Sequence, residues 1–154
     1  MKKLLLLVFA ISLITIYSCS EESPVNPPEN YTFFEKAGLV DSVYTAINGF
    51  TSLSKTMNGS NFDYTGLSTI KVEFKYSKCG SDSTPVQFFY LDNLNPITFY
   101  SFRDSINTPH EVTINQTIPS PGKNTTIGYT LKALKSIEDT LGYVYLRDLS
   151  IKKK

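Results

Sequence analysis

The sequence predicts an all-β domain built as a single sandwich of two sheets. The chain has ten tyrosines and ten phenylalanines but no tryptophan, and its aromatic and β-branched residues favour strands. In several segments apolar and polar residues alternate with a period of two, as in a strand with one face in the core. Gly, Pro, Asn and Asp cluster between these segments at short intervals, which is typical of a sandwich or barrel.

The first 18 residues have the features of an export signal. Lys2 and Lys3 precede an apolar run over residues 4–16. This run is shorter than the roughly 20 residues that a bilayer span needs, so it indicates a secretory signal peptide rather than a transmembrane helix. We expect cleavage after Ser18.

The end of this signal resembles a lipobox. The motif Ile16-Tyr17-Ser18-Cys19 is similar to the bacterial lipoprotein pattern Leu-(Ala/Ser)-(Gly/Ala)-Cys, from which Tyr17 departs most. The resemblance implies that the thiol of Cys19 receives a diacylglycerol, that the signal is cut before Cys19, and that a fatty acid such as palmitate acylates the new amine. The alternative is an ordinary signal peptide that ends beside a cysteine by chance.

Acidic residues directly after the motif indicate a destination. Cys19-Ser20-Glu21-Glu22 resembles the export signal of surface lipoproteins in some Gram-negative bacteria. The resemblance implies an outer-membrane protein that is held by lipid on Cys19 and exposed at the cell surface. Residues 19–30 are rich in proline and bury no hydrophobic face, so we expect a tether of roughly 30–35 Å before a domain at residues 31–154.

The mature chain is close to neutral. Two of the 15 basic residues, Lys2 and Lys3, leave with the signal, so 13 remain against 14 acidic residues. A nucleic-acid partner needs a basic face, and this balance argues against one. With Cys19 lipidated, Cys79 has no partner within the chain, so we expect a free turn thiol, the alternative being a disulfide to another molecule.

The strands are expected in the following order. Weaker patterns at residues 32–36 and 41–47 precede the clearest strand, at residues 69–76. There Ile70, Val72, Phe74 and Tyr76 should face the core, while Lys71 and Glu73 should be exposed. Segments 86–91 and 97–102 are apolar on both faces and should lie centrally, either covered on both sides or lining a groove. Alternation also predicts strands at 111–115, 126–133 and 141–146, and a short helix is suggested at 133–139. Turns are expected at residues 58–59, 79–82, 92–96, 107–109 and 119–122.

The last strand has a break in its pattern. Val144 and Leu146 share one parity, but Leu149 and Ile151 have the other. A regular strand cannot bury all four side chains on one face. We therefore predict a bulge or bend at Arg147–Asp148, because one inserted residue restores the apolar face.

Two pieces of the chain resemble a known kind of sandwich. Phe62-Asp63-Tyr64-Thr65-Gly66-Leu67-Ser68 leads into the strand at 69–76, and Tyr143-Val144-Tyr145-Leu146-Arg147-Asp148-Leu149-Ser150-Ile151 closes the chain. Both resemble jelly-roll sandwiches of the galactose-binding-domain-like kind. The resemblance implies a jelly-roll β-sandwich and carbohydrate binding through aromatic or Asp/Asn-lined loops. An immunoglobulin-like sandwich is the alternative fold.

Residues for catalysis or metal binding are few. His110 is the sole histidine, and without Gly-x-Ser-x-Gly or His-Glu-x-x-His motifs we expect an exposed turn histidine. Glu73, Glu138 and Asp139 are the candidates for a hydrolase pair, but nothing in their spacing brings two of them together. Asp92, Asn93 and Asn95 offer oxygen ligands for calcium, yet such residues are also expected in a turn.

We therefore expect a lipoprotein without a catalytic residue, cofactor or metal. The function expected is non-enzymatic binding of a glycan or a protein partner at the cell envelope. A glycan-active hydrolase and a purely structural envelope component are the alternatives. A row of exposed tyrosine and phenylalanine would favour binding, whereas two carboxylates at hydrolase spacing in a cleft would favour an enzyme.

Overall fold

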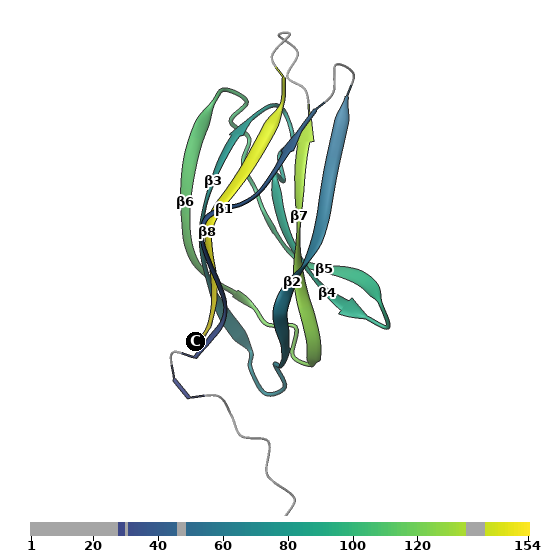
Figure 1. Cartoon of the computed structure of the whole chain (residues 1–154), viewed down its shortest axis with the longest axis vertical. Helices are drawn as coiled ribbons and strands as arrows, with labels where there is room; N and C mark the ends of the chain where they lie inside the picture. Colours follow the sequence, from purple (N-terminus) through teal and green to yellow (C-terminus); the bar gives the residue numbers. More distant parts are fainter. Residues whose placement is uncertain (1–27, 30, 46–48, 135–140) are drawn as a thin grey trace, which may run out of the picture.

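The computed structural model describes residues 28–29, 31–45, 49–134 and 141–154. These residues form eight antiparallel strands in two four-stranded sheets, which pack face to face as a sandwich (Figure 1). The predicted all-β sandwich is therefore confirmed. The strands are β1 (Thr32–Tyr44), β2 (Phe50–Asp63), β3 (Thr69–Cys79), β4 (Val86–Asp92), β5 (Asn95–Phe102), β6 (His110–Pro119), β7 (Asn124–Leu134) and β8 (Tyr143–Lys153). The described part of the chain contains no helix with the length and apolar character needed to cross a membrane.

The strand order is that of a jelly roll. One sheet, which we call sheet A, has the order β1-β8-β3-β6, and the other, sheet B, has the order β2-β7-β4-β5. The pairs β1–β8, β2–β7, β3–β6 and β4–β5 are nested, as in one long hairpin rolled into two sheets. An immunoglobulin-like sandwich divides its strands between the sheets differently, so that alternative is wrong.

The core lies between the sheets and is rich in aromatic rings. Phe74 from sheet A packs against Phe88 and Phe102 from sheet B, with ring centroids 5.8 and 4.9 Å apart in edge-to-face arrangements. The predicted alternation in β3 is confirmed, since Ile70, Val72, Phe74 and Tyr76 are all buried. On the other face Lys71 and Glu73 are half-buried rather than fully exposed, because they form an ion pair with each other.

The predicted irregularity in β8 is confirmed. Arg147 pairs with Leu39 and Leu149 with Lys36, and Asp148 takes a left-handed backbone conformation with φ of 51°. Val144, Leu146, Leu149 and Ile151 are all buried. The carboxylate of Asp148 accepts a hydrogen bond of 2.8 Å from the main-chain N–H of Gly38, which holds the two irregular points of β1 and β8 together.

Strand β2 was not predicted. It is an edge strand rich in serine, threonine and asparagine, so few apolar residues mark its inward face. The turn expected at residues 58–59 is wrong, because these residues lie within β2 where its pairing to β7 shifts between Thr56 and Asn61. Residues 32–36 and 41–44 belong to one strand, β1, which continues through an irregularity at Gly38.

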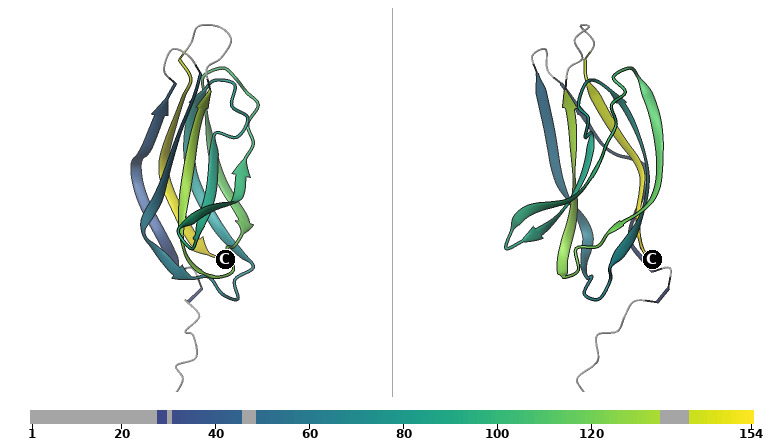
Figure 2. Two further views of the ribbon diagram at one scale, coloured as in Figure 1. Left: turned by 90° about the vertical axis from the view of Figure 1, so that its right-hand side faces the viewer. Right: turned by 180° about the vertical axis from the view of Figure 1, so that it is seen from behind.

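Residues 97–102 do not lie centrally as expected, although Tyr100, Ser101 and Phe102 do line a groove. Strand β4 is interior, but β5 lies at the edge of sheet B. Pro96 has no main-chain N–H to donate, and an edge strand tolerates this because one of its sides has no neighbouring strand. The hairpin of β4 and β5 projects beyond the sandwich in Figure 1 and in the right-hand view of Figure 2. The expected helix at 133–139 begins with Ala133 and Leu134, which end β7, and its other residues lie outside the described part.

Candidate ligand-binding site

A groove opens between the two sheets where the edge strands β5 and β6 face each other. These strands end sheets B and A and do not pair with one another, so the sandwich stays open along this side. The groove has a volume of about 370 Å³. It is lined by Tyr76, Val112, Ile114 and Gln116 from sheet A and by Tyr100, Ser101, Phe102 and Arg103 from β5 and its end.

The groove combines an aromatic wall with polar ends. The Tyr100 ring packs edge-to-face on buried Phe102, with centroids 4.9 Å apart, and remains half-exposed. Gln116 and Arg103 are exposed at the surface. Apolar surface with a few placed hydrogen-bonding groups is the usual character of a small-molecule site.

A second hollow adjoins the groove through Arg103. Its volume is about 480 Å³, and it is lined by Ser83, Thr84, Arg103, Asp104 and Ser105. Arg103 lines both hollows. Within the described residues its guanidinium has no hydrogen-bond or ion-pair partner, so it remains available to a ligand.

A buried polar network lies directly behind these hollows. The carboxylate of Asp104 accepts hydrogen bonds of 2.7 Å from the Tyr76 hydroxyl and 3.0 Å from the main-chain N–H of Ile106. The Nζ atom of Lys78 donates to the main-chain oxygens of Asp82 and Asp104, at 2.6 and 2.7 Å, and lies 3.8 Å from the Asp104 carboxylate. These bonds join β3 to the β3–β4 and β5–β6 connections.

His110 belongs to this network. Its Nε2 atom lies 2.7 Å from the Asp104 carboxylate, and its Nδ1 atom lies 2.7 Å from the main-chain oxygen of Thr108. Both partners are hydrogen-bond acceptors, and either ring nitrogen can donate to its partner. The expectation of an exposed histidine is wrong, because these contacts hold His110 half-buried at the start of β6.

The network stabilises the charged form of Asp104. Burial acts to raise the pKa of this carboxyl group, but hydrogen bonds from Tyr76, Ile106 and His110 outweigh it and hold the pKa below its ordinary value. Burial lowers the pKa of Lys78, against the opposing charges of Asp104 and Asp82. Burial and the bond to Asp104 raise the pKa of Tyr76.

The sequence contained a signal for this network. Lys78 continues the parity of Ile70, Val72, Phe74 and Tyr76, which places a lysine at an inward position of β3. A charge at such a position requires partners. The interpretation of this strand stopped at Tyr76 and missed that requirement.

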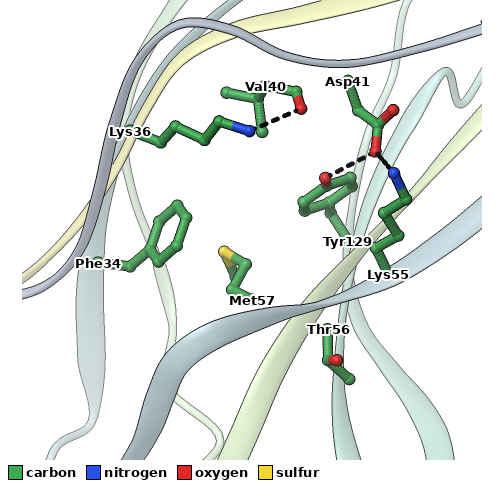
Figure 3. A pocket seen from close by; sticks show the side chains of 8 residues that line it. All are labelled: Phe34, Lys36, Val40, Asp41, Lys55, Thr56, Met57 and Tyr129. Atoms are coloured by element: carbon green, nitrogen blue, oxygen red, sulfur yellow. Dashed lines mark hydrogen bonds and ion pairs between the residues drawn. The ribbon is translucent and has the colours of Figure 1, made fainter.

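The opposite open side, between β1 and β2, holds a smaller pocket of about 240 Å³ (Figure 3). Here Asp41 forms an ion pair of 2.5 Å with Lys55 and accepts a hydrogen bond of 3.1 Å from Tyr129. Lys36 donates to the main-chain oxygen of Val40 at 3.1 Å. Because its charged groups already bind one another, this pocket offers less to a ligand than the groove beside Arg103.

Three tyrosines form a row on the outer face of sheet A. The rings of Tyr44 and Tyr145 lie 5.5 Å apart at an interplanar angle of 86°, and Tyr143 lies 5.0 Å from Tyr145. Arg147 lies over the Tyr145 ring at 5.9 Å. Because Tyr44 and Tyr145 are nearly perpendicular, these two rings do not make one flat surface on which a ligand could stack.

Other candidate residues are dispersed. Glu73 lies on the outer face between Lys71 and Lys152, both at 2.6 Å. Asp92 forms an ion pair with Lys123 at 3.3 Å beside the β4–β5 turn, where Asn93 also lies.

Cys79 is buried at the end of β3, and its thiol lies 3.6 Å from the main-chain oxygen of Asn107. In the part of the chain that the structure describes, no three His, Cys, Asp or Glu side chains gather as a metal site would require. Cys19, Glu138 and Asp139 lie outside the described residues.

Comparison with known proteins yields no family. No family model matches the chain, and no curated protein does so at a significant level. Among solved structures, the chain is similar to infectious bursal disease virus of the Gx strain, with 12% identity and a TM-score of 0.45, and of the Gt strain, with 12% and 0.44. A VP2 subviral particle of the same virus gives 13% and 0.43. These alignments cover 82%, 83% and 83% of this chain but 32%, 32% and 33% of the viral chains, so the protein spans about a third of their length.

Proposed function

We propose that this protein is a non-enzymatic binding module of the cell envelope, and that the groove between β5 and β6 is its glycan site. The observation that carries the proposal is the lining of the groove. A sugar ring has apolar C–H faces and a rim of hydroxyl groups. Tyr100 and its apolar neighbours suit the faces, while Gln116, Ser101 and Arg103 offer hydrogen bonds to the rim.

The proposed lipid anchor at Cys19 would leave the second hollow accessible. Thr32 pairs with Lys152, and Ile70 pairs with Lys153, so β1 begins at the end of the sandwich where β8 finishes (Figure 1). Lys78 pairs with His110 at the other end of β3, roughly 25 Å away at the usual rise of a strand. If residues 19–30 tether the domain to a membrane, Arg103 and the second hollow would therefore face away from the lipid surface.

The electrostatics of the carboxyl groups favour binding over glycoside hydrolysis. A glycosidase needs one carboxylic acid with a raised pKa to protonate the leaving group. Every shifted carboxyl pKa in the described residues is lowered. Four of these groups, Asp41, Asp104, Glu73 and Asp148, line pockets. Hydrogen bonds hold all four ionised, which suits a structural role.

The test is a glycan array probed with the full-length protein purified in detergent. We expect a restricted set of glycans to bind, and we expect Tyr100→Ala and Gln116→Ala to weaken this binding together. Thr56→Ala, in the pocket between β1 and β2, is the matched control and should bind like the wild type. If Tyr100→Ala binds glycan like the wild type and Thr56→Ala loses binding, the glycan site lies instead in the pocket between β1 and β2.

A protein partner is the second candidate, favoured by the β4–β5 hairpin. Leu94 at its tip is 87% exposed and has a φ of 69°, a conformation that suits glycine and costs a leucine about 1 kcal/mol or more. An exposed apolar side chain kept in a strained turn is typical of a contact residue. A photo-crosslinking residue at Leu94 should then capture one defined protein in intact cells, whereas the same residue at Thr113 should not.

A further inference from the structure

Arg103 stands out among the charged residues near the groove. It is one of two arginines in the chain, and it lines both hollows. The other arginine, Arg147, lies over the Tyr145 ring on the outer face of sheet A. Across the residues that the structure describes, Arg103 contacts no carboxylate, so its fork of donors is free for an anion.

The carboxylates near Arg103 are bound by groups other than its guanidinium. Asp104 is the acidic residue of the lining, and its carboxylate is turned to Lys78 and His110 rather than to a ligand. Asp82 of the β3–β4 connection accepts hydrogen bonds from the N–H and the hydroxyl of Thr84. Neither carboxylate forms an ion pair with Arg103, so its guanidinium keeps its hydrogen-bond donors for a ligand.

The backbone that carries Arg103 is firmly held. The next residue, Asp104, donates its main-chain N–H to the oxygen of Ser83 at 2.9 Å and accepts a hydrogen bond from Lys78 on its main-chain oxygen. Its side chain is bound by Tyr76 and His110. A residue held in this way needs little reordering when a ligand arrives, which lowers the entropic cost of binding.

We propose that Arg103 binds the anionic group of an acidic saccharide, with neighbouring sugar units in the groove on one side and in the second hollow on the other. This inference rests on the proposed sugar-binding function of the groove and names its ligand class. The planar guanidinium matches an oxyanion with two parallel hydrogen bonds. Tyr100 and Gln116 in the groove, and Ser83, Thr84 and Ser105 in the second hollow, would bind the uncharged parts of the chain.

The test compares matched oligosaccharides by calorimetry with the full-length protein in detergent. One probe is an oligo-uronate, the second is the same oligosaccharide after its carboxyl groups are reduced to alcohols, and the third carries sulfate esters on the reduced chain. We expect the wild type to bind at least one anionic probe about tenfold or more tightly than the reduced probe. The uronate and sulfate arms distinguish which anion the site takes, and added salt should diminish the difference.

Substitutions assign the effect to Arg103. Arg103→Gln should abolish the preference, so that this variant binds the anionic and the reduced probes within about twofold of each other. Arg103→Lys keeps the charge but loses the fork, so it should retain part of the preference. Arg147→Gln is the control and should behave like the wild type.

The outcomes separate this inference from the function on which it rests. Equal binding of charged and reduced probes by the wild type would refute the acidic ligand while leaving a sugar site. A preference that survives in Arg103→Gln, or that is lost in Arg147→Gln, would also overturn the inference. If no probe binds and the array is empty as well, both proposals are wrong.

Discussion

The ammonium group of Lys78, in a residue only 2% exposed, donates a hydrogen bond of 2.7 Å to the main-chain oxygen of Asp104. Removal of the ammonium group takes away the positive charge that faces the Asp104 carboxylate. It also leaves the main-chain oxygens of Asp82 and Asp104 without their hydrogen-bond donor. We expect Lys78→Met to lower the free energy of unfolding by about 3 kcal/mol. Urea unfolding measures the loss, and Lys78→Met combined with Asp104→Asn should recover part of it. A loss within 0.5 kcal/mol or so, the usual range at surface positions, would contradict this role.

Phe74 tests the packing between the sheets. It contacts Phe88 and Phe102 across the core and is 2% exposed. Phe74→Ala should lower the free energy of unfolding by about 3–5 kcal/mol, because it leaves a cavity in a closely packed interior. Phe50→Ala is the control, since Phe50 is 56% exposed and should lose about 0.5 kcal/mol or less.

Glu73 should make stability depend on acid pH. Hydrogen bonds from Lys152 and Lys71 lower the pKa of Glu73 from 4.5 to about 2 in the folded protein. A carboxyl group with a lowered folded pKa stabilises the fold above its unfolded pKa, and this contribution is lost as the pH falls from about 4.5 to about 2. Thermal unfolding of the wild type and Glu73→Gln should therefore converge across this window. A difference that stays constant from pH 6 to pH 2 would show that the ion pairs do not stabilise the fold.

The irregularity in β8 depends on Asp148. Its left-handed backbone suits Asp, Asn or Gly, and its carboxylate binds the N–H of Gly38. Asp148→Ala adds backbone strain and removes the hydrogen bond, so we expect its midpoint of thermal unfolding to be lower than that of the wild type. Asp148→Asn keeps both features and should lower this midpoint less. Equal decreases in the two variants would argue against this explanation.

The lipid anchor is tested by fractionation. Cys19→Ala removes the thiol that would carry the lipid, so we expect this variant to leave the membrane fraction on carbonate washing while the wild type remains.

Surface display is a separate prediction. Protease added to intact cells should degrade the wild type, and replacement of Glu21 and Glu22 by alanine should protect the protein. Equal protection of wild type and variant would contradict surface display.

Local patterns predicted the inner strands and parts of the edge strands β1, β5 and β6, but missed the edge strand β2 and the edge position of β5. The parity of β3, β7 and β8 is visible in the sequence because one face of each strand is fully buried, and the same parity located the irregularity at Arg147–Asp148. Edge strand β2 has too few apolar residues to show a period, while β5 is apolar but projects with its hairpin. The site depends on pairing between distant strands, so no local pattern could place Arg103 beside Gln116.

The nested pairing also sets the order of events as the chain folds. In sheet A, β8 lies between β1 and β3 and hydrogen-bonds to both. Within the described residues, β1 therefore pairs with the C-terminal strand alone. A chain synthesised only as far as β7 lacks the strand that connects β1 to the rest of its sheet. The domain therefore closes only after its C-terminal strand is available, and contacts over such long sequence separations form slowly. Until then β1 remains an unpaired edge that is open to chaperones and to association with other chains.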